Sequence, residues 1–173
     1  MNKGFTMIEL AVVITVIVIL SAVLISGNQG AEKKMALQRA AYHLSQEFRE
    51  VQEMAMGSGE TQCNTHSFGL YFHQVQYPDS YIIFADCNGN KRKDSPSENI
   101  REAKLEKGVI IYNVAPSVPS EVVFLPPDPF VFINGKEWQD EECIVTLALE
   151  SDPDDPSNQR KVKINSAGRI EIE

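Results

Sequence analysis

The sequence predicts an α+β protein in which one long N-terminal helix packs on a C-terminal antiparallel β-sheet domain. Two observations carry this prediction. Apolar residues recur with helical spacing up to about residue 56, whereas short apolar runs with a period of two dominate from residue 60 onward. The region 60–173 is long enough to bury a core of its own, so we expect it to form one globular domain.

The first half of the helix is expected to lie in a membrane. No charged residue occurs between Glu9 and Glu32, and valine, isoleucine and leucine occupy every side of the helix. We therefore expect residues 5–26 to form a transmembrane helix. A lone carboxylate costs about 2.5–3.5 kcal/mol at the centre of a bilayer and less near its edge, so Glu9 calls for a positive partner from another chain. An ordinary anchor whose Glu9 reaches the interface is the alternative.

The second half of the helix, residues 27–57, turns amphipathic. Its apolar residues recur at spacings of three and four along one side, at Leu37, Ala41, Leu44, Phe48, Val51 and Ala55. The opposite, polar side is expected to hold Lys34, Arg39, Glu47, Arg49, Glu50 and Glu53. So narrow a stripe fits one sheet packed on one side, and a free coiled coil is the alternative.

Glycines mark the middle and the end of this helix. Gly27 and Gly30 each lower helix propensity by about 1 kcal/mol relative to alanine. We expect the helix to bend or melt locally around Gly27 in an assembled filament, and a flexible kink at the membrane interface with no role in assembly is the alternative. Gly57 follows the last helical residue, a position that favours glycine.

Short strands are expected throughout the C-terminal domain. They are predicted at residues 68–72, 81–85, 104–106, 109–114, 121–125, 130–133, 143–149, 161–165 and 169–172. The last two are expected to form a hairpin across the turn at residues 166–168.

The sequence contains three cysteines, Cys63, Cys87 and Cys143. Cys63 and Cys87 bracket the predicted hairpin of residues 68–72 and 81–85, so this pair is the favoured disulfide. Three free, buried thiols are the alternative. An exported domain can retain a disulfide, and the odd count leaves one thiol over.

Residues 86–97 place oxygen-bearing side chains where a calcium-binding loop needs them. Positions 1, 3, 5 and 9 of that template are Asp86, Asn88, Asn90 and Asp94. The glycine and the final glutamate of the template are missing, since Lys91 and Ser97 stand in their places. A polar hairpin loop without metal is therefore favoured over a calcium site.

The sequence offers no catalytic constellation. His43, His66 and His73 show no metal-binding spacing, and no G-x-S-x-G, phosphate loop or H-E-x-x-H occurs. We expect neither a cofactor nor enzymatic activity. The net charge of −8 gives the chain no electrostatic reason to bind nucleic acid.

The segment Lys3-Gly4-Phe5-Thr6-Met7-Ile8-Glu9-Leu10 closely resembles the type III signal of the type IV prepilin family, which includes the pseudopilins of type II secretion. The resemblance implies a leader of residues 1–4, cleavage between Gly4 and Phe5, and N-methylation of Phe5. Glu9 then matches the acid of the family, and we expect it to pair with the Phe5 amine of a neighbouring subunit.

The C-terminal half is similar to the H-type pseudopilin and FimT group of minor pilins. The segments that carry this similarity are 68–72, 81–90, 124–128 and 165–170. The group implies a minor subunit that sits at a filament tip or primes assembly. Because FimT-like pilins of competence systems bind DNA, the basic cluster Lys91-Arg92-Lys93 could capture DNA, although a solvated loop is favoured.

These resemblances predict a minor pilin or pseudopilin subunit of a type IV pilus or of a type II secretion pseudopilus. The expected partners are the prepilin peptidase and methyltransferase, other pilins, the inner-membrane assembly platform and membrane lipid. The expected location is the inner membrane, with one pass and a periplasmic C-terminal domain, and then a periplasmic or cell-surface filament. The alternatives are a DNA-binding minor pilin of a competence system and a membrane-tethered periplasmic binding domain that never polymerises.

Overall fold

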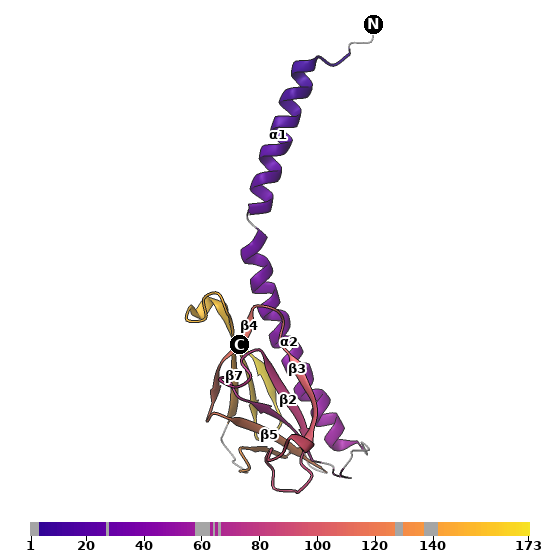
Figure 1. The fold of residues 1–173 in the computed structure, drawn as a ribbon, viewed down its shortest axis with the longest axis vertical. Coiled ribbons are helices and arrows are strands. Elements are labelled where there is room, and N and C mark those ends of the chain that lie inside the picture. The colour runs from indigo at the N-terminus through magenta and orange to yellow at the C-terminus, as the bar shows by residue number, and fades with distance from the viewer. Residues whose placement is uncertain are drawn as a thin grey trace. The chain divides into compact units, whose positions relative to one another are not determined.

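The computed structural model confirms the α+β class, because a helical N-terminal region is followed by two antiparallel sheets. It describes residues 4–26, 28–57, 63, 65, 67–126, 130–136 and 142–173. Its contacts divide the chain into two compact units, Met1–Met35 and Ala36–Glu173. Figure 1 traces the elements in chain order.

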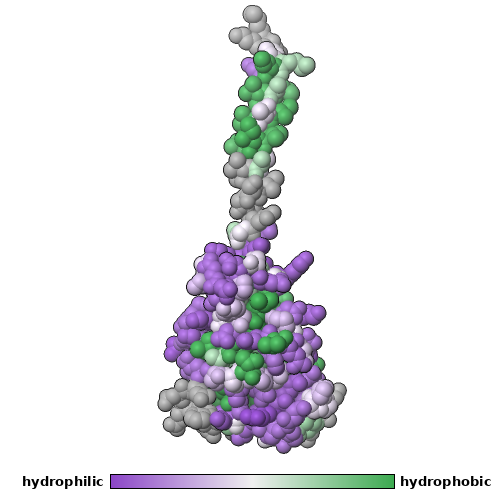
Figure 2. All heavy atoms as spheres, turned by 60° about the vertical axis from the view of Figure 1, so that its left-hand side comes forward, coloured by the Kyte–Doolittle hydropathy of each residue, from purple (hydrophilic) through white to green (hydrophobic). Residues whose placement is uncertain are grey.

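Helix α1 (Met7–Ser26) makes up most of the first unit. Its side chains from Met7 to Ala22 are all exposed, and even the large residues Leu10 and Ile17 remain more than half exposed. In Figure 2 this stretch forms a nearly continuous hydrophobic surface. An apolar surface of this extent is typical of a contact with a membrane or with another protein.

Among the helical residues whose side chains are described, no stretch has both the length and the hydropathy of a membrane span.

Helix α2 (Asn28–Met56) carries the predicted amphipathic stripe. Within the second unit the buried face of this helix is at most 4% exposed, and it consists of Leu37, Ala40, Ala41, Leu44, Phe48, Val51 and Ala55. The last turn closes where glycine was expected, since the Gly57 N–H donates to the Glu53 carbonyl oxygen at 2.8 Å. The bend predicted at Gly27 falls outside the described residues and stays a prediction.

The strands form two antiparallel sheets. The five-stranded sheet has the order β3-β2-β1-β5-β6, from β1 (Phe68–Phe72), β2 (Ser80–Ala85), β3 (Asn99–Lys104), β5 (Ser120–Leu125) and β6 (Phe130–Ile133). The four-stranded sheet has the order β4-β7-β8-β9, from β4 (Val109–Ala115), β7 (Glu142–Leu149), β8 (Gln159–Asn165) and β9 (Ile170–Ile172). The predicted C-terminal hairpin is confirmed, because β8 and β9 pair Val162 with Ile172 and Ile164 with Ile170.

One predicted strand is wrong. Residues 104–106 were expected to be extended, but β3 covers Asn99–Lys104 and a turn follows it. β3 is an edge strand whose side chains are exposed except for the half-buried Ala103. Polar edge strands show no alternation of apolar residues, so pairing with β2 defines this strand and the local pattern does not.

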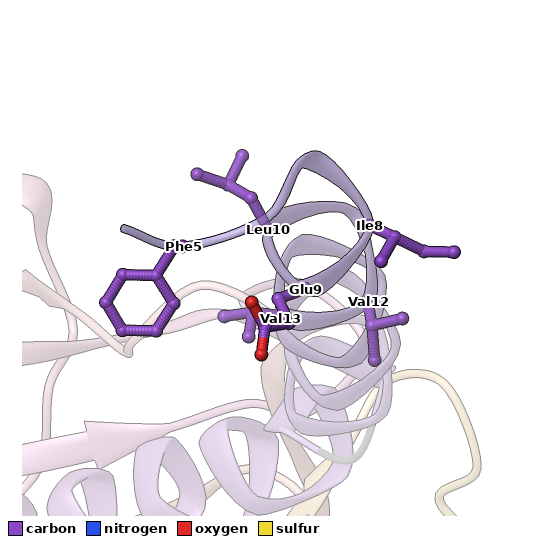
Figure 3. Close-up of a pocket in the computed structure, with 6 residues that line it drawn as sticks. All are labelled: Phe5, Ile8, Glu9, Leu10, Val12 and Val13. Carbon is purple, nitrogen blue, oxygen red and sulfur yellow. The ribbon is translucent and has the colours of Figure 1, made fainter. Parts of the chain in front are cut away.

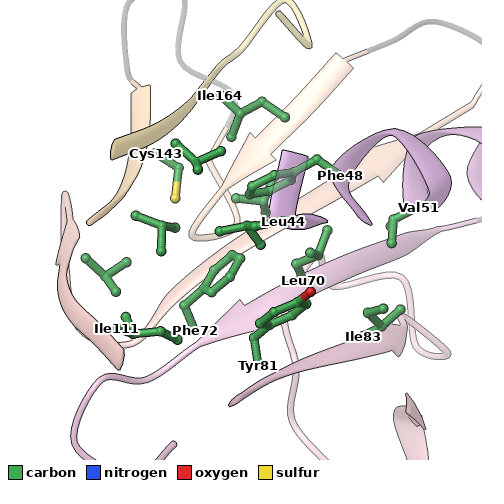
Figure 4. Close-up of a cluster of buried hydrophobic side chains, with 14 of the residues drawn as sticks. Leu44, Phe48, Val51, Leu70, Phe72, Tyr81, Ile83, Ile111, Cys143 and Ile164 are labelled. Carbon is green, nitrogen blue, oxygen red and sulfur yellow. The ribbon is translucent and has the colours of Figure 1, made fainter. Parts of the chain in front are cut away.

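One core lies between α2 and both sheets, which corrects the expectation of a single sheet against the helix. Figure 4 shows Leu44, Phe48 and Val51 of α2 directed toward side chains of β1 and β2. The Phe48 and Phe72 rings stand 5.7 Å apart, and the Phe72 and Tyr81 rings are also 5.7 Å apart. The other sheet contributes residues such as Ile111, Cys143 and Ile164 to the same cluster.

The middle strand β1 requires glycine at position 69. A Cβ atom on Gly69 would stand 2.6 Å from the Val122 carbonyl oxygen and 2.8 Å from the Phe84 ring. No side chain fits in this space, so the phenylalanine ring of β2 packs directly on the β1 backbone.

Ion pairs tie one flank of α2 to β3 and to the segment that follows β3. Glu47, expected on the polar side of the helix, is only 5% exposed, and its Oε2 lies 2.6 Å from Arg101 Nη2 on β3. Burial raises the pKa of Glu47, and the Arg101 charge opposes that shift. Arg39 binds both carboxylate oxygens of Glu106 at 2.8 Å. The prediction that Glu47 lies on the polar side of the helix was wrong, because its partner Arg101 lies 54 residues away in the sequence.

Cys63 and Cys87 are joined by a disulfide. The bond connects the segment before β1 to the loop that follows β2, where Cys87 is the second residue. Cys143 is free and buried, with its sulfur 3.6 Å from the Ser120 hydroxyl, and burial raises the pKa of the Cys143 thiol to about 12. The leftover thiol is therefore an inert core residue.

Replacing both Cys63 and Cys87 with serine should lower the free energy of unfolding by about 3 kcal/mol, because the bond closes a loop across a sequence separation of 24. Denaturant unfolding of the full chain in detergent measures this loss. Reducing the wild-type protein should give a similar loss, while the double variant should not respond to reductant. Equal stability of reduced and oxidised wild-type protein would contradict the prediction.

Candidate functional site

The predicted processing site is exposed at the start of the first unit. Phe5 is 90% exposed, and a Cβ atom on Gly4 would meet nothing within 4 Å. No packing within the described chain therefore requires glycine at position 4. A requirement for glycine there would have to come from a partner that approaches the backbone closely.

Thr6 and Glu9 form a capping box at the start of α1. The Glu9 Oε2 atom accepts hydrogen bonds from the Thr6 N–H at 2.8 Å and from the Thr6 hydroxyl at 2.9 Å. In return, the Glu9 N–H donates to Thr6 Oγ1 at 3.3 Å. A threonine followed three residues later by glutamate is the sequence signature of this motif, so the signal was present in the sequence and our interpretation missed it.

The capping box gives hydrogen-bond partners to polar groups at the start of an apolar helix. It does not place a cation beside the negative charge of Glu9. Both donors bind Oε2, and no donor within the described residues binds Oε1. The ion pairs found in the described part of the chain do not include Glu9. Further along α1, the Thr15 hydroxyl is satisfied by the Ala11 carbonyl oxygen at 2.8 Å, so only Glu9 brings an uncompensated charge to the described part of this helix.

An open hollow lies beside this carboxylate (Figure 3). Its lining residues are Phe5, Ile8, Glu9, Leu10, Val12 and Val13. Figure 3 shows the Phe5 ring and the Glu9 carboxylate on the same side of the helix start, with Ile8 and Val12 on the other side. The arrangement suits an apolar partner that carries one positive charge.

The comparisons with known proteins match this same segment. Residues 1–25 match the family model described as the prokaryotic N-terminal methylation motif. No curated protein and no solved structure gives a significant match. The chain therefore carries a type IV prepilin-like signal, and the motif supports a type IV pilin-like or pseudopilin protein. Such a signal implies processing by a prepilin peptidase and assembly with other pilins.

The predicted calcium loop is held by hydrogen bonds of its own. Asp86 is fully buried, and its carboxylate accepts from the backbone N–H groups of Gly89 at 2.9 Å, Asn90 at 3.2 Å and Lys91 at 2.8 Å. Gly89 has a φ of 73°, which lets the backbone turn its N–H groups onto this carboxylate. Asp86 therefore organises the loop backbone.

The other predicted ligands of the calcium template bind one another. The side-chain amides of Asn88 and Asn90 both donate to Asp94 Oδ2, the former at 3.0 Å, and these bonds lower the pKa of Asp94. Glu98, which is 4% exposed, accepts the Asp94 N–H at 2.9 Å. In the part of the chain that the structure describes, no group of three or more acidic, histidine or cysteine residues is arranged to hold a metal.

The basic cluster of the same loop packs on the five-stranded sheet. The Lys91 ammonium lies 3.7 Å from the centroid of the Phe132 ring, and the Lys93 ammonium lies 5.1 Å from that of Tyr71. Arg92 donates to the Asn134 carbonyl oxygen at 3.2 Å. These cations contact the sheet face opposite the main core, where the buried residues are Ile82, Phe84, Val123 and Phe132. The cluster therefore has a packing role that the sequence did not reveal.

Calcium at about 1 mM, the range of weak extracellular sites, should neither produce binding heat nor raise Tm, because the oxygens of the template already accept N–H groups. Isothermal titration and thermal unfolding of the full chain in detergent measure both quantities, and magnesium serves as the control ion. A calcium-specific rise in Tm that disappears in Asp94→Asn would establish the alternative site.

Proposed function

We propose that this protein is a minor pilin or pseudopilin subunit that assembles through its N-terminal helix into a type IV pilus or a type II secretion pseudopilus. The observation that carries the proposal is the methylation motif over residues 1–25, lying on a helix whose described apolar side chains are exposed on all sides. An exposed apolar helix of this kind requires another apolar surface to pack against it. In a filament, the helices of sister subunits would provide that surface.

In the proposed mechanism, cleavage between Gly4 and Phe5 creates an amine, and methylation modifies it. The Glu9 carboxylate of one subunit then pairs with the Phe5 amine of its neighbour. Thr6 supports this arrangement by holding Glu9 Oε2, which leaves Oε1 toward an incoming cation. Pairing removes two isolated charges from an apolar surrounding, where each costs several kcal/mol.

The finer assignments also belong to this proposal. Residues 5–26 would span the inner membrane before assembly, with the C-terminal domain in the periplasm, and the assembly platform would extract the subunit into the filament. The similarity to the H-type pseudopilin and FimT group supports a place at the tip or in initiation. The subunit would be structural and would carry no enzymatic activity.

Two other functions remain distinct alternatives. A DNA-binding role would use Lys91, Arg92 and Lys93, but the contacts of all three with the domain surface do not favour it. A tethered binding domain that never polymerises would keep the same fold and would show no need for Glu9.

Mass spectrometry of the native N-terminus tests the proposal directly. We expect the purified protein to begin with N-methylated Phe5, since the segment around Gly4 and Phe5 resembles the cleavage site of the type IV prepilin signal. Replacing Gly4 with a bulky residue should leave the precursor uncut, although the fold has room for the side chain. A native chain that retains Met1 would contradict the assignment to the pilin class.

Glu9→Leu should leave cleavage and membrane insertion intact and should abolish incorporation into filaments, because the amine of the neighbour loses its counter-charge. Fractionation of sheared filaments, probed for this subunit, measures incorporation. Glu53→Leu, a change of the same type at an exposed position of α2, serves as the matched control. Normal incorporation of Glu9→Leu would refute the pairing.

A further inference from the structure

The 86–98 loop contains an Asn–Gly peptide, Asn88–Gly89, in an unusual surrounding. In such a peptide the glycine nitrogen can attack the asparagine side-chain carbonyl carbon, because glycine has no side chain to hinder the five-membered ring. The ring forms with loss of ammonia, and water then opens it to aspartate or isoaspartate. Three groups of the loop contact the reacting atoms.

The first group is a carboxylate that can act as a base toward the attacking nitrogen atom of Gly89. The Gly89 N–H donates to Asp86 Oδ1 at 2.9 Å, and Asp86 is fully buried. A carboxylate in this position can accept the proton as the Gly89 nitrogen attacks. Asp86 is therefore placed as a general base toward a backbone nitrogen.

The second group stabilises developing charge, and the third contacts the leaving group. The Asn90 N–H, which is shared with Asp86 Oδ1, donates to Asn88 Oδ1 at 3.1 Å. This oxygen becomes negative when the carbonyl carbon is attacked. The Asn88 Nδ2 atom, which must leave as ammonia, donates to Asp94 Oδ2 at 3.0 Å. These two bonds fix the amide with its carbonyl oxygen toward the backbone donor.

We propose that Asn88–Gly89 is a self-modification site at which Asp86 catalyses deamidation. Asp86 takes the Gly89 proton, the Gly89 nitrogen bonds to Asn88 Cγ, and the Cγ–Nδ2 bond breaks as the proton passes to the departing ammonia. One water molecule then hydrolyses the ring, so the sum is asparagine plus water giving aspartate or isoaspartate plus ammonia. Asp86 is regenerated, and no oxidant or cofactor takes part.

The modification changes the loop electrostatically. It replaces the Asn88 amide, which donates to Asp94, by a carboxylate that cannot donate. The loop thereby loses one of its closing hydrogen bonds and gains a negative charge beside Asp94. This inference does not depend on the proposed assembly function.

The chain holds its own control in a second Asn–Gly peptide, Asn134–Gly135. Asn134 Oδ1 accepts the Glu121 N–H at 2.9 Å, and its Nδ2 donates to the Ser117 hydroxyl at 2.9 Å. Within the described ranges, no carboxylate accepts a hydrogen bond from the Gly135 N–H. Asn134 thus has the same Asn–Gly sequence, and no carboxylate of the described residues is placed as a base toward the Gly135 nitrogen.

Incubation of the full chain in detergent at neutral pH, followed by peptide mapping with mass spectrometry, tests the proposal. Asn88 should deamidate about 10²-fold faster than Asn134 in the folded protein, the contribution typical of general-base catalysis. In the reduced chain unfolded in urea the two sites should react at similar rates. Equal or slower reaction at Asn88 in the folded protein would overturn the assignment.

Two variants distinguish loss of the proposed base from loss of the folded structure. Asp86→Asn should abolish the excess rate at Asn88, and circular dichroism shows whether the domain remains folded. Asp152→Asn removes an exposed carboxylate outside this loop, so it should retain the excess rate. Should Asp86→Asn fold normally and still deamidate at the wild-type rate, general-base catalysis by Asp86 is excluded.

Discussion

The need to satisfy carboxylates away from water shapes the sites of this protein. Glu9 stands at the edge of an exposed apolar helix, and its capping box with Thr6 supplies two hydrogen bonds but no cation. A carboxylate can be stabilised by donors within its own chain, yet its charge in an apolar surrounding still favours an opposite charge. The proposed assembly mechanism follows from that remaining requirement, because a neighbouring amine supplies the missing cation where apolar helices meet.

In the C-terminal domain, groups of the same domain stabilise the buried carboxylates. Asp86 is buried among three backbone N–H groups, and Glu98 accepts from three backbone N–H groups of the same loop. Glu47 is buried beside the Arg101 guanidinium. Each buried carboxylate therefore has partners that fix a loop or a helix flank, and the exposed edge strand β3 is held to α2 through one of them.

A loop fixed by carboxylates also brings reactive groups together. The backbone donors that hold Asp86 include the nitrogen of an Asn–Gly peptide, so the interaction that orders the loop is also the one that can activate Gly89. The resemblance of this loop to a calcium template has the same origin, since closely spaced oxygens that accept backbone N–H groups resemble oxygens that coordinate a cation.

The sequence by itself determined the α+β class, the inner stripe of α2, most strands and the N-terminal signal, because each is encoded by residues close together in the chain. It also contained the capping box as Thr6 and Glu9, three residues apart. Only the tertiary structure decided that both sheets share the core with α2, that Glu47 is buried against Arg101, and that Lys91 packs on Phe132. These contacts join residues that are far apart in sequence, and hydrophobic periodicity carries no information about which distant partner a polar side chain meets.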